Sequence, residues 1–382
     1  MLIVLLTASA AFILTYLAIP AIMRVAEEKK LFDLPDARKL HTKPIASLGG
    51  VGIFIGLFVA TLLSVSFRES SGFQYIFAAS MVIFFLGLKD DILILSPTKK
   101  FFGQLAAAAI LIHLGGIRIE SMNGFFGINE IPAFAGIMLS YATIIVVINA
   151  FNLIDGVDGL ASFLGILSTA VFGTYFLTAG LETYALLSFS LTACLVAFMV
   201  YNYHPAKIFM GDSGSLLLGL INALLVIKFI NVAGNTASAL PIQSAAAIGF
   251  SILVVPLLDT LRVFSIRISR KRSPFAPDRL HIHHLLLDRG LNHSQVAFSC
   301  FGLNLSFIAM AYFGRTMGTT FLITLMIFVM YGLVGALIYF KKPVRKLVVA
   351  KSFQHNKDIK ELVVPPTTKV VSLKSEAAAV EQ

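Results

Sequence analysis

Long apolar runs separated by short polar stretches dominate this chain. The runs cover roughly residues 2–23, 46–66, 73–88, 102–118, 132–150, 160–179, 182–201, 214–233, 242–261, 295–314 and 318–340. Segments of about 20 apolar residues cross a bilayer as helices, because a helix satisfies its own backbone hydrogen bonds in hydrocarbon. The pattern therefore predicts an all-α, polytopic integral membrane protein with about eleven transmembrane helices.

The composition agrees with this fold class. Of the 382 residues, 57% are hydrophobic and only 13% are charged, and the mean hydropathy is +0.87. A soluble domain carries about a quarter of charged residues. No basic residue precedes Arg24, so we interpret the first run as a retained helix rather than a cleaved signal peptide. Cys194 and Cys300 lie inside predicted helices without metal-ligand spacing, and we expect both to be buried apolar residues.

Lysine and arginine predict the orientation. Of these 30 residues, 26 lie in the connections after the first, third, fifth, seventh and ninth helices or near the C-terminus, the exceptions being Arg68, Arg118, Lys228 and Arg315. Because such residues accumulate in cytoplasmic loops, we expect the N-terminus outside and the C-terminus in the cytoplasm of the cell inner membrane. Residues 1–340 then form a transmembrane domain, and residues 341–382 a basic, flexible cytoplasmic tail.

The charge also limits the partners. A net charge of +10 on the cytoplasmic face suits anionic lipid headgroups and anionic substrates. The charge is spread over several loops rather than gathered in one stripe, so we predict no nucleic acid partner. The small residues of Gly49-Gly50 favour close helix packing and a possible homodimer. Asn123-Gly124, within the outer connection at 115–131, favours a short hairpin.

Paired carboxylates mark the first of four polar clusters. Asp90-Asp91 ends the third apolar run, and Lys100 and Gln104 follow at the start of the fourth. Adjacent carboxylates repel each other and favour a bound cation, and Mg²⁺ takes oxygen ligands of this kind. A solvated loop with two chance acids is the structural alternative. The cluster is consistent with chemistry on a diphosphate.

Two further clusters combine acids, amides and glycines. Asn152-Leu-Ile-Asp155-Gly-Val-Asp158-Gly159 follows the fifth run, and Asn202 to Ser215 contains Phe209 and Asp212. Capping of the next helix is an alternative role for Asp212. An acid at that place also suits Mg²⁺ against a diphosphate, and Phe209 could stack on a nucleobase.

The fourth cluster is Asp278-Arg279-Leu-His281-Ile-His283-His284. Clustered histidines raise the possibility of zinc, but no cysteine is near and the acids elsewhere suit Mg²⁺ better. Imidazole and guanidinium donors instead favour binding of phosphate oxygens as charge develops during transfer.

These four clusters, in this order, resemble the polyprenyl-phosphate N-acetylhexosamine-1-phosphate transferase family. The resemblance extends from about Pro20 to Gly290, and the His-x-His-His form is that of its sugar-1-phosphate branch. Lys89 departs from the family pattern. The resemblance implies transfer of N-acetylglucosamine 1-phosphate from UDP-GlcNAc to undecaprenyl phosphate with release of UMP, using Mg²⁺ or Mn²⁺. It places this reaction as the first membrane step of a cell-envelope polysaccharide.

The resemblance also implies roles for individual residues. The catalytic residues are Asp90, Asp91, Asp155, Asp158, His281, His283 and His284. The metal ligands are Asp212, Asp155 and Asp91. The substrate-binding residues are Lys39, His41, Lys43, Lys100, Asn152, Asn202, Phe209, Arg262 and Arg279.

Two other functions compete with this one. A related branch transfers phospho-MurNAc-pentapeptide, but it carries consecutive histidines, and Ile282 interrupts the run here. A transporter for an anionic sugar or nucleotide needs ionisable residues near the bilayer midplane. The acids of this chain lie instead at the ends of the apolar runs, which favours an enzyme at the membrane surface.

Overall fold

Helices make up nearly all of the fold. The computed structural model describes residues 1–33, 44–65, 72–93, 95–273 and 280–340. The helices are α1 (Leu2–Lys29), α2 (Gly49–Ser64), α3 (Phe73–Leu93), α4 (Pro97–Ala109), α5 (Ala133–Ile154), α6 (Leu160–Thr178), α7 (Glu182–Asn202), α8 (Gly211–Ala233), α9 (Ala245–Ile252), α10 (Val254–Ser269), α11 (Ile282–Leu287), α12 (His293–Phe313) and α13 (Thr319–Tyr339). A π-helical turn (Ile110–Leu114) extends α4, and a 3₁₀ turn (Arg315–Met317) precedes α13.

The described helices confirm a multi-pass membrane protein. Seven of them, α1, α5, α6, α7, α8, α12 and α13, are long and apolar enough to cross a bilayer, and the bent pair α9 and α10 makes up to eight. Helix α2 is apolar but shorter. Each of the eleven apolar runs lies on at least one helix, whereas the number eleven and the orientation of the termini stay predictions.

The ninth apolar run is not one straight helix, contrary to the sequence prediction for residues 242–261. Helices α9 and α10 meet at Leu253 with a bend of 78°. Such a break frees backbone groups that need other partners inside a bilayer. Asn304 on α12, which is 1% exposed, accepts from Val255 N (3.1 Å) and donates to Ile252 O (2.9 Å). Sequence periodicity shows no break here because both halves are equally apolar.

Helix α8 lies at the centre of the bundle. It packs against α2, α3, α5, α6 and α9. Its most apolar stretch is 78% buried, compared with 28% for α1 and 22% for α13. A helix that is apolar on all sides is best placed in a core. The N-terminal turn of α8 is therefore surrounded by neighbouring helices, whose ends supply the polar residues described below.

Glycines bring two helices close to α8. A Cβ atom at Gly50 on α2 would lie 2.1 Å from the backbone nitrogen of Gly214, and one at Gly87 on α3 would lie 2.5 Å from the carbonyl oxygen of Asp212. Helix packing at Gly49-Gly50 is thus confirmed, but it is internal. These two glycines consequently provide no surface for a homodimer.

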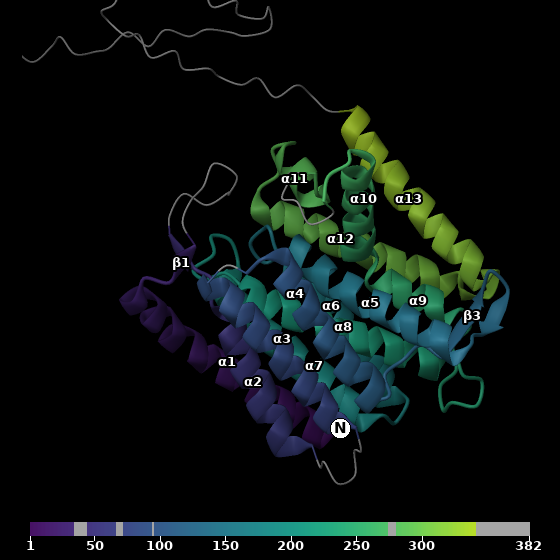
Figure 1. Cartoon of the computed structure of the whole chain (residues 1–382), viewed down its shortest axis with the longest axis horizontal. Coiled ribbons are helices and arrows are strands. Elements are labelled where there is room, and N and C mark those ends of the chain that lie inside the picture. The colour runs from purple at the N-terminus through teal and green to yellow at the C-terminus, as the bar shows by residue number, and fades with distance from the viewer. Residues whose placement is uncertain (34–43, 66–71, 94, 274–279, 341–382) are drawn as a thin grey trace, which may run out of the picture.

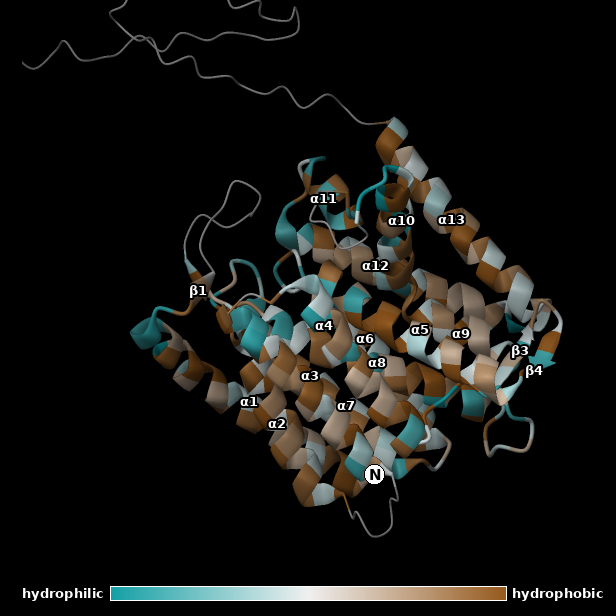
Figure 2. Ribbon diagram, in the orientation of Figure 1, coloured by the Kyte–Doolittle hydropathy of each residue, from teal (hydrophilic) through white to brown (hydrophobic). Residues whose placement is uncertain are grey.

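Polar segments gather at the ends of the bundle. The short strands β1 (Phe32–Asp33) and β2 (Ile45–Ala46) pair antiparallel, and β2 also pairs with Ile208. In Figure 1, β1 lies at the left and α11 near the top. The N-terminus lies at the bottom and β3 at the right. Figure 2 shows mostly brown helices and teal segments near α11 and the start of α4.

The hairpin predicted within residues 115–131 is confirmed, although its turn is at other residues, and its place on the outer side stays a prediction. Strands β3 (Ser121–Phe125) and β4 (Ile128–Glu130) pair antiparallel. Phe126 and Gly127, both with positive φ, connect them. Asn123-Gly124 lies within β3 instead, where the pairing register shifts.

Candidate active site

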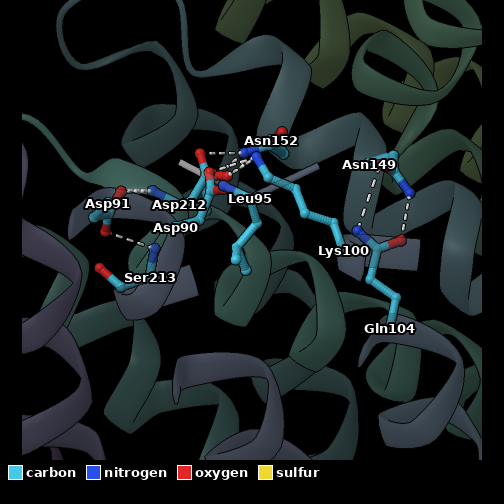
Figure 3. A network of polar contacts seen from close by, with 10 residues as sticks. Asp90, Asp91, Leu95, Lys100, Gln104, Asn149, Asn152, Asp212 and Ser213 are labelled. Carbon is cyan, nitrogen blue, oxygen red and sulfur yellow. Dashed lines mark hydrogen bonds and ion pairs between the residues drawn. The ribbon is translucent and has the colours of Figure 1, made fainter. Parts of the chain in front are cut away.

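The paired aspartates meet the first turn of α8. Gly87 lets α3 approach α8 closely, so the end of α3 lies beside the exposed amides of the α8 N-terminus. Asp91 accepts hydrogen bonds from Asp212 N (2.7 Å) and Ser213 N (3.0 Å) (Figure 3). A carboxylate there satisfies orphan amides and is favoured by the helix dipole. Lys89 is exposed and takes no part in this network.

Lys100 joins two of the carboxylates. It comes from the first turn of α4, and its Nζ lies 2.5 Å from both Asp90 Oδ2 and Asp212 Oδ2. Asp90 Oδ1 also accepts from Leu95 N, at 2.5 Å. Residues from α3, α4 and α8 are therefore joined by charge-assisted hydrogen bonds, as Figure 3 shows.

Amides complete this network on the α5 side. Asn152 donates to Asp212 Oδ1 and to Ser215 Oγ, both at 3.0 Å. Gln104 and Asn149 pair through their side chains, with Asn149 Nδ2 to Gln104 Oε1 at 2.8 Å. The expected cluster of Asp90, Asp91, Lys100, Asn152 and Asp212 is thus one connected structure, although its members are far apart in the sequence.

Asp155 is a carboxylate of the site that has no hydrogen-bond or ion-pair partner among the described residues. It caps the C-terminus of α5 and is half-buried. Burial raises the pKa of Asp155 well above its usual value, and the negative charges of Asp212, Asp91 and Asp158 raise it further. The local charge is therefore more negative than the described side chains can compensate.

Asp158 belongs to a different set of contacts. Its Oδ2 lies 2.6 Å from His204 Nδ1 and 3.2 Å from His293 Nδ1. Burial alone would raise the pKa of Asp158, but the hydrogen bonds with His293 and His204 outweigh it and hold the pKa below its usual value. The three groups lie within 4.8 Å of one another, close enough to share a metal ion. The two histidines already occupy Oδ2 of the carboxylate, so the cluster is connected by hydrogen bonds among its own side chains.

Asn202 and Phe209 hold the loop before α8. Asn202 accepts from Gly159 N (2.9 Å) and donates to Ile208 O (2.9 Å), so it joins two of the predicted motifs. Phe209 is half-buried, and its backbone N–H donates to Ala46 O (2.8 Å). The described contacts of Asn202 are with protein backbone, and its predicted contact with substrate stays a prediction.

The three histidines have different surroundings. His281 is buried, with Nδ1 2.9 Å from Asp259 Oδ2 and Nε2 3.4 Å from Arg267 Nη2. His283 is buried against Gly156, where an added Cβ would lie 2.6 Å from His283 Nε2. Burial, then the neighbouring His284, lowers the pKa of His283 to about 3. The histidine segment and the Asp155 loop are therefore in direct contact.

Arg262 is the remaining predicted residue within the described part of the chain. Arg262 on α10 donates to Asp259 Oδ1 (2.9 Å) and to Leu280 O. Lys39, His41, Lys43 and Arg279 lie outside the described residues, as does the predicted tail.

Sequence reasoning missed three residues of these networks: His204, Asp259 and His293. Asp259 lies at the end of an apolar run, where its partners 22 residues later are not apparent from spacing. His293 is a single histidine before α12. His204 lies within the cluster from Asn202 to Ser215, and its position two residues after Asn202 was the sequence signal for a role in the site.

Comparison with known proteins shows the family of this chain. Residues 73–230, which include Asp90 through Asp212, match the model of glycosyl transferase family 4. A decaprenyl-phosphate N-acetylglucosaminephosphotransferase from Mycobacterium leprae is 32% identical over 318 residues, covering 75% of this chain and 77% of the relative. The chain belongs to glycosyl transferase family 4.

Other relatives carry similar names. A probable undecaprenyl-phosphate N-acetylglucosaminyl 1-phosphate transferase from Bacillus subtilis is 34% identical, with 74% of this chain and 78% of the relative covered. An undecaprenyl-phosphate alpha-N-acetylglucosaminyl 1-phosphate transferase from Escherichia coli K12 is 29% identical, with 74% and 76% covered. Membership of this family makes the chain a glycosyl-1-phosphate transferase.

Proposed function

We propose that this enzyme transfers N-acetylglucosamine 1-phosphate from UDP-GlcNAc to undecaprenyl phosphate. An oxygen of the lipid phosphate attacks the phosphorus that carries the sugar. The bond from that phosphorus to the UMP phosphate breaks, and UMP leaves. The product is undecaprenyl diphosphate-GlcNAc, the first lipid-linked unit of a cell-envelope polysaccharide. The relatives named above support this choice of donor and acceptor.

One observation carries the proposal. Asp90, Lys100, Asn152 and Asp212, from four helices, form a single hydrogen-bonded network at the start of α8. Phosphoryl transfer depends mainly on positioning and on neutralising charge. A cluster of carboxylates, one lysine and amides at a membrane edge suits a reaction between two phosphates, one of which is attached to a lipid.

Lys100 and Asn152 are the groups we assign to the phosphates. The Lys100 side chain is 26% exposed, and one of its three N–H donors is left after its contacts with Asp90 and Asp212. In the reaction it would neutralise a phosphate oxygen while the carboxylates keep its ammonium group in place. Asn152 orients the Asp212 carboxylate by its 3.0 Å hydrogen bond. His283 and His284 would also donate to phosphate oxygens.

The carboxylates suit Mg²⁺ or Mn²⁺. Oxygen ligands are those that hard divalent cations prefer, and the crowded charge around Asp155 fits a site that gains a cation. Asp91, Asp155 and Asp212 would hold the ion. When bound, it would neutralise diphosphate oxygens and polarise the bond to the leaving UMP.

An apolar cavity offers room for the lipid tail. It has a volume of about 330 Å³ and extends from Leu261 on α10, past Phe250 and Val146, to Phe125 in the hairpin. Apolar lining suits a prenyl chain, whose burial is favoured by the hydrophobic effect. We place the polar network at the cytoplasmic face of the inner membrane, where the sequence predicts the basic loops.

The test uses the full-length protein in membranes. Radiolabelled UDP-GlcNAc and undecaprenyl phosphate are added with Mg²⁺, and labelled lipid diphosphate and UMP are measured. The wild type should form both in equal amounts, and added UMP should reverse the reaction. Asp212→Asn should lower the rate by about 10³-fold or more, because it removes a group required in the transition state. The matched control is Glu130→Gln, an exposed acid in the distant hairpin.

Two results would contradict the proposal. Release of UMP that does not depend on undecaprenyl phosphate would exclude the lipid acceptor. Product formation from UDP-MurNAc-pentapeptide, without any from UDP-GlcNAc, would assign the enzyme to the related branch instead.

A further inference from the structure

A buried carboxylate lies outside the proposed phosphate-binding network. Asp259 is on α10, six residues after the break at Leu253, and is 1% exposed. Burying a charge is costly unless it is paired and hydrogen-bonded. Nothing in the reaction above uses Asp259, so its partners indicate what it does.

Two partners of Asp259 lie in the segment just before His283 and His284, and a third, Arg262, lies on α10 itself. Asp259 Oδ2 lies 2.9 Å from His281 Nδ1, and Oδ1 accepts from Ile282 N at 3.0 Å. Oδ1 also accepts from Arg262 Nη2 at 2.9 Å, and this guanidinium donates in turn to Leu280 O. Helix α10 therefore holds residues 280–282 by side-chain and backbone groups alike.

These contacts fix the state of His281. The Arg267 guanidinium is a donor only, so His281 Nε2, at 3.4 Å from it, must accept. Nδ1 then carries the proton and donates to Asp259. Both ring nitrogens of His281 are occupied by protein groups, and the side chain is 4% exposed. His281 consequently has the contacts of an anchor, and the catalytic role that the resemblance implied stays a prediction.

The anchor determines where the next histidines lie. His283 follows His281 by two residues and packs against Gly156, in the loop of Asp155. We propose that Asp259 is a positioning residue, which acts through His281 and Ile282 to hold His283 and His284 against the Asp155 loop. This inference rests on the transfer function proposed above. Mutation of a residue that contacts and orients a reacting group commonly lowers activity by about 10–100-fold.

Rate measurements on four variants test the proposal. Asp259→Asn keeps the shape but removes the charge, and we expect kcat to fall about 10–100-fold with KM for UDP-GlcNAc changed less than about threefold. His281→Ala should cause the same loss, and the double variant no more than either one, because both act through one contact. His281→Asn keeps an amide donor near the position of Nδ1 and should stay within about tenfold of the wild type.

His281→Asn separates anchoring from chemistry. If His281 acted on substrate by its imidazole, this variant would be as inactive as His281→Ala, and that result would overturn the proposal. Wild-type kcat in Asp259→Asn would overturn it too. Glu130→Gln is again the control for an acid-to-amide change.

Hydrogen exchange gives a measure that does not depend on activity. The amide of Ile282 donates to Asp259, so Asp259→Ala in detergent should speed exchange in residues 280–287 by about tenfold, with α1 unchanged. Equal exchange in variant and wild type would overturn the positioning role. An inactive wild type would count against the transferase function alone, because the exchange experiment would still report on Asp259.

Discussion

Asp155 and Asp259 are both carboxylates surrounded by protein, yet their surroundings are opposite. Asp259 is fully buried and is paired with an imidazole, a guanidinium and a backbone amide. Asp155 is half-buried, has no described partner and faces other negative charges. The segment that Asp259 contacts meets the loop of Asp155, since His283 touches Gly156.

The difference separates two uses of a buried charge. A carboxylate with several donors around it, such as Asp259, fixes the geometry of its neighbours. An unsatisfied one destabilises the folded chain by itself and becomes favourable when a cation arrives. Carboxylates that lack partners among the described residues therefore indicate the site of chemistry, whereas well-paired ones indicate its support.

The largest difference between the two carboxylates should appear when each is changed to asparagine, beginning with Asp155→Asn. Loss of this carboxylate should lower transfer activity by about 10³-fold, as for removal of an essential ligand. In chelator-treated protein the same change should raise the melting temperature, because it removes repulsion with Asp91 and Asp212. Asp259→Asn should lower the melting temperature, since it leaves buried donors and a guanidinium without their charge partner.

Melting can be followed with a thiol-reactive fluorophore. Cys194 and Cys300 are both buried, so the dye reacts as the bundle opens. Excess Mg²⁺ should stabilise the wild type and leave Asp155→Asn unaffected. A lower melting temperature in metal-free Asp155→Asn would show that this carboxylate is structural.

His283 extends the comparison to pH. Its pKa is lowered to about 3 by burial, from 6.5 in the unfolded chain. Between these values the unfolded chain binds a proton that the folded chain does not. The folded protein is therefore at its full stability above pH 6.5. Its free energy of unfolding falls as the pH drops below that value, by about 1.4 kcal/mol at pH 5.5.

Circular dichroism melts at pH 7.5 and 5.5 measure this loss. His283→Gln cannot titrate, so its melting temperature should change less between the two pH values than that of the wild type. Equal changes in both proteins would mean that His283 is not kept neutral by burial. His113→Gln is the control, because His113 is an exposed histidine in the π-helical turn.

The fold was largely predictable because a membrane helix is encoded locally. Each apolar run forms helix, since length and hydrophobicity suffice when every backbone group must bond within its own segment. The break between α9 and α10 was not predictable. Its backbone groups are satisfied by Asn304, 49 residues after Val255, and no local pattern reports such a partner.

The site was predictable in its members but not in its pairings. The acids stood out because polar residues at the ends of apolar runs are unusual. Spacing did not show that Lys100 joins Asp90 to Asp212, or that His281 pairs with Asp259. Those outcomes depend on which helix ends meet, and that is set by close contacts such as the one at Gly87.

The most local effect should come from Asn304, whose hydrogen-bond partners are neutral backbone groups. Asn304→Ala leaves Val255 N and Ile252 O without their partner, at a cost of about 1–3 kcal/mol for buried polar groups. Because Cys300 lies one turn earlier on α12 and Cys194 lies on α7, the two thiols report different regions. Cys300, read in a Cys194→Ala background, should react sooner in the Asn304 variant, while Cys194, read in a Cys300→Ala background, should react at its usual rate. Ser306→Ala, an exposed change on the same helix, should alter neither. Equal acceleration of both thiols would mean that Asn304 stabilises the whole bundle, and that the bend between α9 and α10 is held by the packing around it rather than by this one amide.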